Sequence, residues 1–271
     1  MYVNEPFEPK TFEHYIQDPS LLKTLKHPIC LVGMPDQTNL GRNCAEYLIQ
    51  ELKAEKVVIF NFNDFGPSIS VEEQDRIVTL AKIEVYVVKK YHEIADLIIV
   101  MGNGVPISNI GIHFLSDKIA EFLSSLKPRL IISFASFPIS YPTPTPKTYL
   151  AHTSEELLHL FKINKKTHTN EDLGLQLLKK GIVLGMNGLI ISYAKALYDT
   201  IGGILLSETV IQEKIDPHAV KAILEVINAV FNLNLSLASL RLDTKEYFKK
   251  VTPEPLSEDD LLKKARKRIK S

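Results

Sequence analysis

The sequence predicts an α/β protein in which a mostly parallel sheet is flanked by helices. Two observations carry this prediction: short apolar runs alternate with amphipathic stretches, and residues 29–33 are apolar without interruption. Alternating strand and helix patterns are typical of α/β domains, and an unbroken apolar run suits a strand that is buried on both faces. A chain of 271 residues is long enough for one large domain or two small ones.

The elements follow from the apolar pattern and from helix start and stop signals. Residues 40–53 place Cys44 and Leu48 on one helical face, with Asn39 as the expected N-cap. Further strands are expected at residues 57–62, 83–88, 96–101, 129–134, 149–151 and 201–207. Further helices are expected through Phe114 and Leu126 up to Pro128, from Ser154, over residues 171–180 with Gly181 as C-cap, over residues 187–198, from Asp216-Pro217, and over residues 237–250.

Proline and charge divide the chain into three parts. Residues 1–28 are expected to form an arm with at most one short helix, residues 29–235 the α/β core, and residues 236–271 a helical extension with a charged tail. Within the core, Pro142, Pro144 and Pro146 cannot continue a helix or a central strand. Residues 137–147 are therefore expected to form an exposed, semi-rigid loop, which is either a binding element or a spacer.

Composition excludes several classes of protein. Basic and acidic residues both number 32, so no long-range field selects nucleic acid or an anionic membrane. The chain has no apolar run of about 20 residues, the length that a membrane span needs, and its first residues lack the pattern of a signal peptide. Cys30 and Cys44 are interpreted as buried reduced thiols, which fits a reducing compartment. We expect a cytoplasmic protein.

Two glycine-containing turns follow predicted strands. The first, from Gly33 through Pro35 to Gly41, leads into a helix, so it is either a structural turn or an anion site at the helix N-terminus. It matches neither dinucleotide nor P-loop fingerprints, and Asp36 would repel phosphate. The second contains Gly102 and Gly104, which suit a tight turn with positive φ and could line the same cleft.

A third turn and one carboxylate lie in the C-terminal half. In Gly185-Met186-Asn187-Gly188, Asn187 is expected to accept N–H groups of the helix that it opens, and Gly188 allows close backbone packing. Glu208 stands at the end of an apolar strand, where it can accept from a backbone N–H or meet a basic partner. No second acid lies nearby in sequence, so paired acid–base chemistry has no support.

Motifs of common enzymes are missing from the sequence. The eight histidines are scattered, and neither Cys-x-x-Cys nor His-Glu-x-x-His occurs, so no metal or other cofactor is expected. Ser133, Ser136 and Ser140 lie near strand ends, but none is in a Gly-x-Ser-x-Gly turn. A triad assembled from distant residues stays open at this point.

The order of these motifs resembles the proteasome assembly chaperone 2 family over residues 29–235. The resemblance rests on residues 31–35 with Gly41, on residues 149–156, on residues 185–189, and on Glu208 and Asp216-Pro217. It implies a phosphorylase/hydrolase-like α/β fold, homo-oligomers and no established enzymatic activity. Some family members assist assembly of the proteasome α-ring.

The sequence departs from the family pattern in two places. The first turn has Asp36, Gln37 and Thr38 where the family has glycine-rich residues. Assembly chaperones of this kind often end in hydrophobic-Tyr-any, which docks between α subunits. The candidate docking residues here are Ile269, Lys270 and Ser271; Ile269 fits the first position, whereas Lys270 replaces the aromatic residue.

The resulting hypothesis is a non-enzymatic, oligomeric chaperone or interaction protein whose partners are further copies of itself and proteasome α subunits, without nucleic acid or membrane. The alternative is an enzyme or small-ligand binder that acts on a phosphorylated or nucleoside-like ligand. The candidate cleft residues are Gly33, Pro35, Gly41, Gly102, Asn187, Gly188 and Glu208. The alternative rests on analogy between folds.

Overall fold

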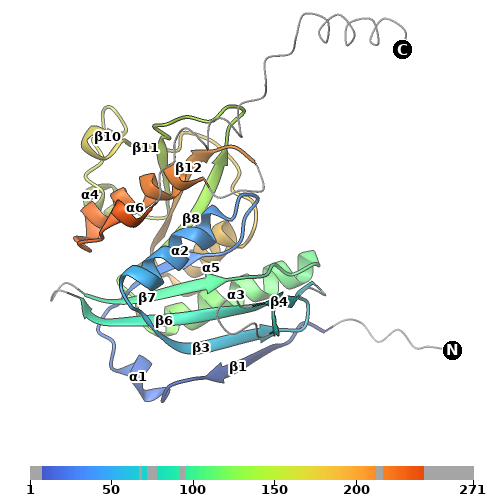
Figure 1. Ribbon diagram of the computed structural model, residues 1–271. Helices are drawn as coiled ribbons and strands as arrows, with labels where there is room; N and C mark the ends of the chain where they lie inside the picture. The colour runs from blue at the N-terminus through green and yellow to red at the C-terminus, as the bar shows by residue number, and fades with distance from the viewer. Residues whose placement is uncertain (1–7, 67–68, 72–77, 92–94, 212–215, 241–271) are drawn as a thin grey trace, which may run out of the picture.

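A ten-stranded mixed sheet with helices on both faces forms the protein (Figure 1). The computed structural model describes residues 8–66, 69–71, 78–91, 95–211 and 216–240. The strand order is β1-β3-β6-β7-β2-β8-β12-β9-β11-β10. The α/β class is as predicted, but the expectation of a mostly parallel sheet is wrong. Among these described strands, five of the nine neighbouring pairs are antiparallel.

The centre of the sheet is parallel and matches the apolar runs of the sequence. It consists of β7 (Ala95–Gly102), β2 (Ile29–Gly33), β8 (Leu130–Pro138) and β12 (Gly202–Thr209). All five residues of β2 are buried because helices cover both of its faces. The carboxyl ends of these four strands meet at one edge of the sheet, where ligands of α/β proteins commonly bind.

Antiparallel strands extend the sheet on both sides. On one side lie β6 (Lys82–Tyr91), β3 (Glu55–Phe62) and β1 (Thr11–Tyr15). A separate hairpin of β4 (Ile69–Val71) and β5 (Val78–Leu80) lies between β3 and β6 in the chain. On the other side lie β9 (Thr148–His152), β11 (Leu175–Leu177) and β10 (Thr169–Asn170). Part of the predicted N-terminal arm is therefore the edge strand β1, followed by the short helix α1 (Ser20–Lys23).

The helices form one layer on each face of the sheet (Figure 1). One layer contains α2 (Leu40–Glu51) and α6 (Pro217–Phe231), whose apolar sides pack on Leu31, Ile132 and Leu205. The other contains α3 (Asn109–Ser125) and α5 (Met186–Tyr198), which pack on Val32, Ile131 and Leu206. Because successive strand residues point to opposite faces, each central strand contributes to both cores.

The helix predicted over residues 171–180 does not form. Its first three residues make a 3₁₀ turn, η1 (Glu171–Leu173), which Gly174 ends with φ at 59°. Leu175 to Leu177 then pair in parallel with β9 as strand β11. Gly181 was predicted to end this helix in a left-handed conformation. Gly174 takes that conformation instead, seven residues earlier, so Gly181 is no C-cap.

Two other elements differ in extent from their predictions. The helix expected from Ser154 is the short α4 (Glu156–Leu160), and Ser154 Oγ accepts the Glu156 N–H. Of the helix expected over residues 237–250, the described part is η2 (Leu237–Ser239). The rest of that helix and the tail with Ile269, Lys270 and Ser271 lie outside the described residues. No helix in the described ranges has the length and apolarity needed to cross a bilayer.

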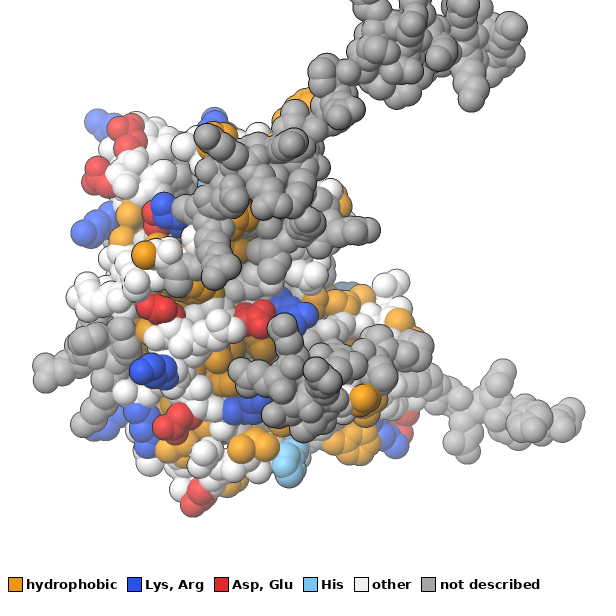
Figure 2. Space-filling view, in the orientation of Figure 1, with side chains coloured by type: hydrophobic (Ala, Val, Ile, Leu, Met, Phe, Trp, Pro, Cys, Tyr) orange, Lys and Arg blue, Asp and Glu red, His pale blue; other side chains and the backbone are white. Residues whose placement is uncertain are grey.

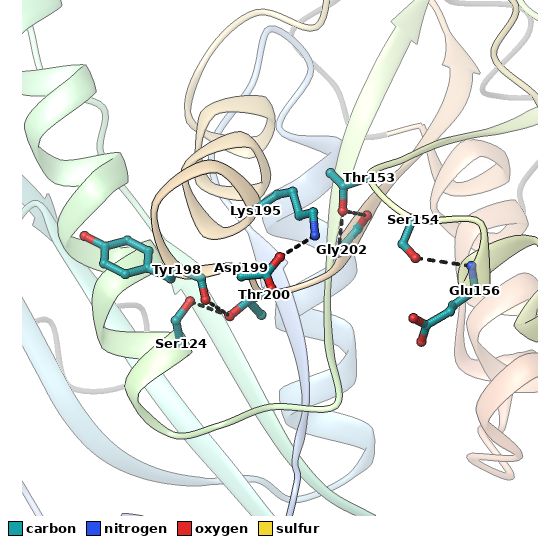
Figure 3. Close-up of polar contacts among 9 residues, drawn as sticks. All are labelled: Ser124, Thr153, Ser154, Glu156, Lys195, Tyr198, Asp199, Thr200 and Gly202. Atoms are coloured by element: carbon teal, nitrogen blue, oxygen red, sulfur yellow. Dashed lines mark hydrogen bonds and ion pairs between the residues drawn. The ribbon is translucent and has the colours of Figure 1, made fainter.

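Hydrogen bonds fix the junction where α5 ends and β12 begins (Figure 3). Asp199 ends the helix in the left-handed conformation, with φ at 50°. Thr200 then donates to Ser124 Oγ of α3 at 3.0 Å. Thr153 accepts the Gly202 N–H at 2.9 Å and donates to the Gly202 carbonyl at 3.0 Å. The start of β12 is thereby attached both to α3 and to the residue after β9.

Asp216 caps α6 as the sequence predicts, and it also holds the preceding strand. Asp216 Oδ1 accepts the N–H groups of His218 at 3.0 Å and Ala219 at 3.2 Å, while Oδ2 accepts the Thr209 hydroxyl at 3.0 Å. Pro217 occupies the first helical position, where no N–H is needed. The side chain is buried, so each lost partner would leave a polar group without water.

We predict that Asp216→Ala lowers the free energy of unfolding by about 2 kcal/mol, the upper range for an N-cap, because it leaves the Thr209 hydroxyl unpaired as well. Urea denaturation measures the change. Asp216→Asn is the matched control: it keeps an acceptor for the helix and should lose less. Equal stability of Asp216→Ala and wild type would show that this cap contributes nothing.

Candidate functional site

Asp36 organises the turn between β2 and α2. Its Oδ1 accepts the N–H groups of Thr38 at 3.1 Å and Leu40 at 3.0 Å, and its Oδ2 accepts the Ser136 N–H at 2.8 Å. Asp36 therefore performs the capping that the sequence assigned to Asn39, which has φ at 56° and no capping bond from its side chain. Both carboxylate oxygens are occupied by backbone groups of β8 and of the turn leading into α2.

Asn187 connects the first α/β unit to α5 instead of capping its own helix. Its Oδ1 accepts the Met34 N–H at 2.9 Å, and its Nδ2 donates to the Met34 carbonyl at 3.1 Å. The predicted role as N-cap is wrong, because α5 begins one residue earlier and Gly185, with φ at 85°, precedes it. Ser133 Oγ of β8 donates to the Asn187 carbonyl at 2.8 Å. Only 2% of Asn187 is exposed, so these bonds form within the core.

Glycines allow the backbones around Asn187 to approach closely. A Cβ on Gly33 would lie 2.1 Å from the Gly41 carbonyl oxygen, and one on Gly41 would lie 2.4 Å from that of Phe134. A Cβ on Gly102 would lie 2.8 Å from Met34 Sδ. The prediction of positive φ at Gly102 and Gly104 is wrong; close packing against Met34 and Ala81 explains the absence of side chains.

Glu208 has two partners within the protein. Its Oε2 accepts the Lys147 N–H at 3.1 Å, and its Oε1 accepts the Tyr149 hydroxyl at 2.7 Å. Burial, together with the hydrogen bond to the Glu208 carboxylate and its charge, raises the pKa of Tyr149 to about 12. Tyr149 also packs on Phe137, with ring centroids 4.8 Å apart. Glu208 thus joins β12 to the end of the proline-rich loop, and one of its bonds is the predicted one to a backbone N–H.

The structure brings most of the candidate residues together. Gly33, Gly41, Gly102 and Asn187 meet around Met34, and Gly188 packs next to them against Val183. Glu208 belongs to a separate cluster, with Lys147 and Tyr149. Sequence reasoning missed the wall formed by residues 178–185, because residues 178–181 were expected to be the end of a helix and its cap, and residues 182–184 were assigned to no element. Nothing in the sequence Val183-Leu184-Gly185 before the helix indicates that these residues form the wall of a cavity.

A cavity of about 440 Å³ opens at the carboxyl ends of β2, β8 and β12. Pro35, Asp36 and Gln37 of the first turn line one side, and residues 181–185 line another. Its remaining lining comes from Val105, Leu178, Leu206 and residues 135–138. The described lining is predominantly apolar, and the one carboxylate among its residues is that of Asp36.

The described residues include no group of three or more His, Cys, Asp and Glu side chains that could hold a metal ion. Cys30 and Cys44 are buried free thiols, as predicted. Burial raises the pKa of both thiols, so the reactive thiolate form is disfavoured. Around Met34, the polar atoms of Asp36 and Asn187 bind backbone groups, so this part of the site positions chain segments.

Comparison with known proteins gives consistent results. A sequence model of the PAC2 family matches residues 30–252. The uncharacterized protein MJ1210 of Methanocaldococcus jannaschii is 26% identical over 254 residues, which cover 89% of this chain and 93% of that protein.

Two solved structures from Pyrococcus furiosus are similar to this chain over nearly their whole length. One is PbaB, described as an archaeal proteasome activator: TM-score 0.73, 25% identity, 94% of this chain and 98% of PbaB covered. The other is PbaA, described as an archaeal homolog of proteasome-assembly chaperone: TM-score 0.67, 20% identity, 91% of this chain and 93% of PbaA covered. The mixed α/β fold is therefore shared with these proteins.

We predict that Gly41→Ala destabilises the protein by about 3 kcal/mol or more, because the added Cβ meets backbone oxygens that have no room to move. Gly66→Ala is the matched control, since the nearest atom to its Cβ is Ile107 Cγ2 at 3.7 Å. We expect the control to stay within about 0.5 kcal/mol of wild type. Thermal denaturation of both variants measures the difference, and equal melting would contradict the close approach at Gly41.

Proposed function

Because the chain belongs to the PAC2 family, we propose that it is a non-enzymatic, oligomeric interaction protein that assists proteasome assembly. The observation that carries the proposal is the similarity to PbaB and PbaA over more than nine-tenths of the chain. Their descriptions, a proteasome activator and a homolog of proteasome-assembly chaperone, make the proteasome the partner to test, and the family resemblance of the sequence points to its α subunits. A cytoplasmic location is part of the same proposal.

The geometry around Asn187 supports a binding role. Catalytic or ligand-binding side chains need lone pairs or protons that are free to meet a substrate. Here Asp36, Asn187 and Glu208 direct theirs to other parts of the chain. These polar residues therefore stabilise the fold at the edge where α/β enzymes usually place their chemistry.

An exposed apolar surface near the same edge supports contact with another protein. Ile107 and Ile110 precede and open α3, and their side chains are 72% and 66% exposed. Ile182 and Leu184 lie in the wall of the cavity and are 88% and 76% exposed. Val105 lies two residues before Ile107 in the chain and lines the same cavity as Ile182 and Leu184. Contiguous exposed apolar residues commonly mark interaction sites, so we assign partner docking to this apolar rim: Val105, Ile107, Ile110, Ile182 and Leu184.

The alternative, an enzyme or binder of phosphorylated ligands, has one observation in its favour: a cavity at the carboxyl ends of the strands. The turns with Gly33, Gly102 and Asn187 do converge, as such a site would require. However, protein backbone fills the space between them, and the Asp36 carboxylate lines the cavity. Phosphate would meet a like charge there, so we favour the interaction protein.

Self-association would begin at the edge strand β1, which has β3 as its one neighbour among the described strands. Lys10 accepts the Asn63 N–H and Ile16 donates to Val57, so the even-numbered residues direct their backbone groups to β3. Those of Glu13 point away from β3, where a second chain can pair with them. In Figure 2, hydrophobic side chains lie exposed among charged ones in the lower part of this face, over β1 and β3.

We predict that wild type forms a homo-oligomer and that Glu13→Pro reduces it, because proline removes an outward N–H and leaves the β1–β3 bonds intact. Light scattering at micromolar concentration measures the mass. Glu13→Ala is the matched control, which keeps the N–H and should assemble like wild type. A strictly monomeric wild type contradicts self-association, and an unchanged Glu13→Pro oligomer contradicts the role of β1.

For the partner, we predict that the chain binds purified proteasome α subunits and that Ile107→Asp with Ile110→Asp weakens binding by roughly tenfold or more. Burying a carboxylate without a partner opposes docking. Leu197→Asp is the matched control. Leu197 is also an exposed apolar residue, but it lies near the C-terminal end of α5 and is not part of the apolar rim. A binding titration compares the three proteins.

The tail provides a second arm of the same titration. Removing residues 269–271 should leave affinity unchanged, whereas Lys270→Tyr should increase it, since an aromatic ring fills an apolar slot that the lysine ammonium enters only after desolvation. Loss of strong binding on truncation, with the two isoleucine changes neutral, would place the dock in the tail. Absence of any binding by wild type would contradict the proposed partner.

A further inference from the structure

We infer that the cavity at the carboxyl ends of β2, β8 and β12 is a binding site for a small, uncharged, largely apolar molecule. The cavity has a volume of about 440 Å³, within the range of about 300–1,000 Å³ typical of small-molecule sites. Ala135, Phe137 and Leu206 line it from the sheet, and the buried Ala135 and Leu206 show that it reaches the core. This inference does not depend on the proposed partner.

The wall that encloses the cavity is anchored at both ends. At one end, Leu178 donates its N–H to the Leu150 carbonyl of β9 at 2.9 Å. At the other, Val183 packs so closely on α5 that a Cβ on Gly188 would lie 3.1 Å from its carbonyl oxygen and from its Cγ1. Gly185 then turns the chain into α5 with positive φ. The binding space is thus formed before a ligand arrives, which lowers the entropic cost of binding.

The lining determines the charge of the ligand. Asp36 is the one charged residue among the described residues of the lining, and its two oxygens are directed to N–H groups of Thr38, Leu40 and Ser136. An anionic ligand would face this carboxylate, and the described part of the lining offers no compensating cation, which disfavours phosphates and carboxylates. An uncharged apolar body meets Phe137, Leu178 and Val183 instead, and its transfer from water is favourable.

The volume determines the approximate size of the ligand. An apolar protein cavity of about 150 Å³ accepts one benzene molecule. The cavity here is about three times as large, so it has room for a molecule of about three aromatic rings or an equally compact aliphatic one. We therefore assign it to neutral molecules of this size, with the amide of Gln37 and the hydroxyl of Ser136 available at its edge for one polar substituent.

The test is a fluorescence titration of the full chain with 1-aminoanthracene, a neutral three-ring probe whose emission rises in apolar surroundings. We expect saturable binding of one probe per chain. Ala135→Leu adds a side chain inside the cavity and should weaken binding by roughly tenfold. Val105 lies half-exposed at the opening of the cavity, so Val105→Trp should block the cavity and weaken binding without disturbing the core.

Two controls separate the cavity from general surface adhesion and from anion binding. Ile107→Ser removes an exposed apolar side chain that does not line the cavity, and it should bind the probe like wild type. Anthracene-1-carboxylate, similar in shape but anionic, should bind roughly tenfold more weakly than the neutral probe. Unsaturable binding, equal affinity of the two folded cavity variants and wild type, or a preference for the anion would overturn the inference. Proteasome binding by wild type, measured separately, is unaffected by any of these outcomes.

Discussion

The paired hydrogen bonds between the Asn187 side chain and the backbone of Met34 are the interaction on which the rest of the site depends. They join residues 153 positions apart, one at the end of β2 and one in the first turn of α5. An amide is the one neutral side-chain group that offers both a donor and an acceptor in the geometry of a peptide bond. Met34 is fully buried, so neither of its backbone groups can turn to water instead.

This contact explains why glycines are needed around Met34 and why the cavity and its rim are lined by apolar side chains. With Asn187 seated against β2, the turn after that strand passes within van der Waals distance of α2 and β8, which leaves no room for side chains at Gly33 and Gly41. Asp36 ties the same turn to β8. The polar groups at the carboxyl edge thus hold chain segments together, and apolar side chains line the cavity and its rim. A surface of this kind suits association with proteins or with uncharged molecules.

The sequence predicts the parallel centre of the sheet because its strands are continuous apolar runs, and it predicts α6 because Asp216 and Pro217 are an unambiguous start. It does not predict the antiparallel flanks. Whether two strands pair in parallel depends on how the chain connects them, and the apolar pattern of a strand does not show this. The antiparallel strands β3 and β6, for example, are joined through the β4–β5 hairpin. The motif around Asn187 was identifiable, but its role was not, since an Asn before an apolar helix matches an N-cap and a long-range bond equally well. The wall of residues 178–185 was missed because the apolar pattern of residues 171–180 matches a helix. In the structure the helical turn stops at Gly174, and the chain that follows is extended instead.

The most direct test of this account is amide hydrogen exchange at Met34 in wild type and in Asn187→Ala, with Val32 of β2 as internal reference. Loss of the Asn187 amide should release the Met34 N–H while the ladder bonds of Val32 persist, so exchange at Met34 should accelerate by at least about tenfold more than at Val32. If Met34 stays as protected relative to Val32 in the variant as in wild type, the Asn187 side chain does not hold the end of β2, and the central claim is wrong.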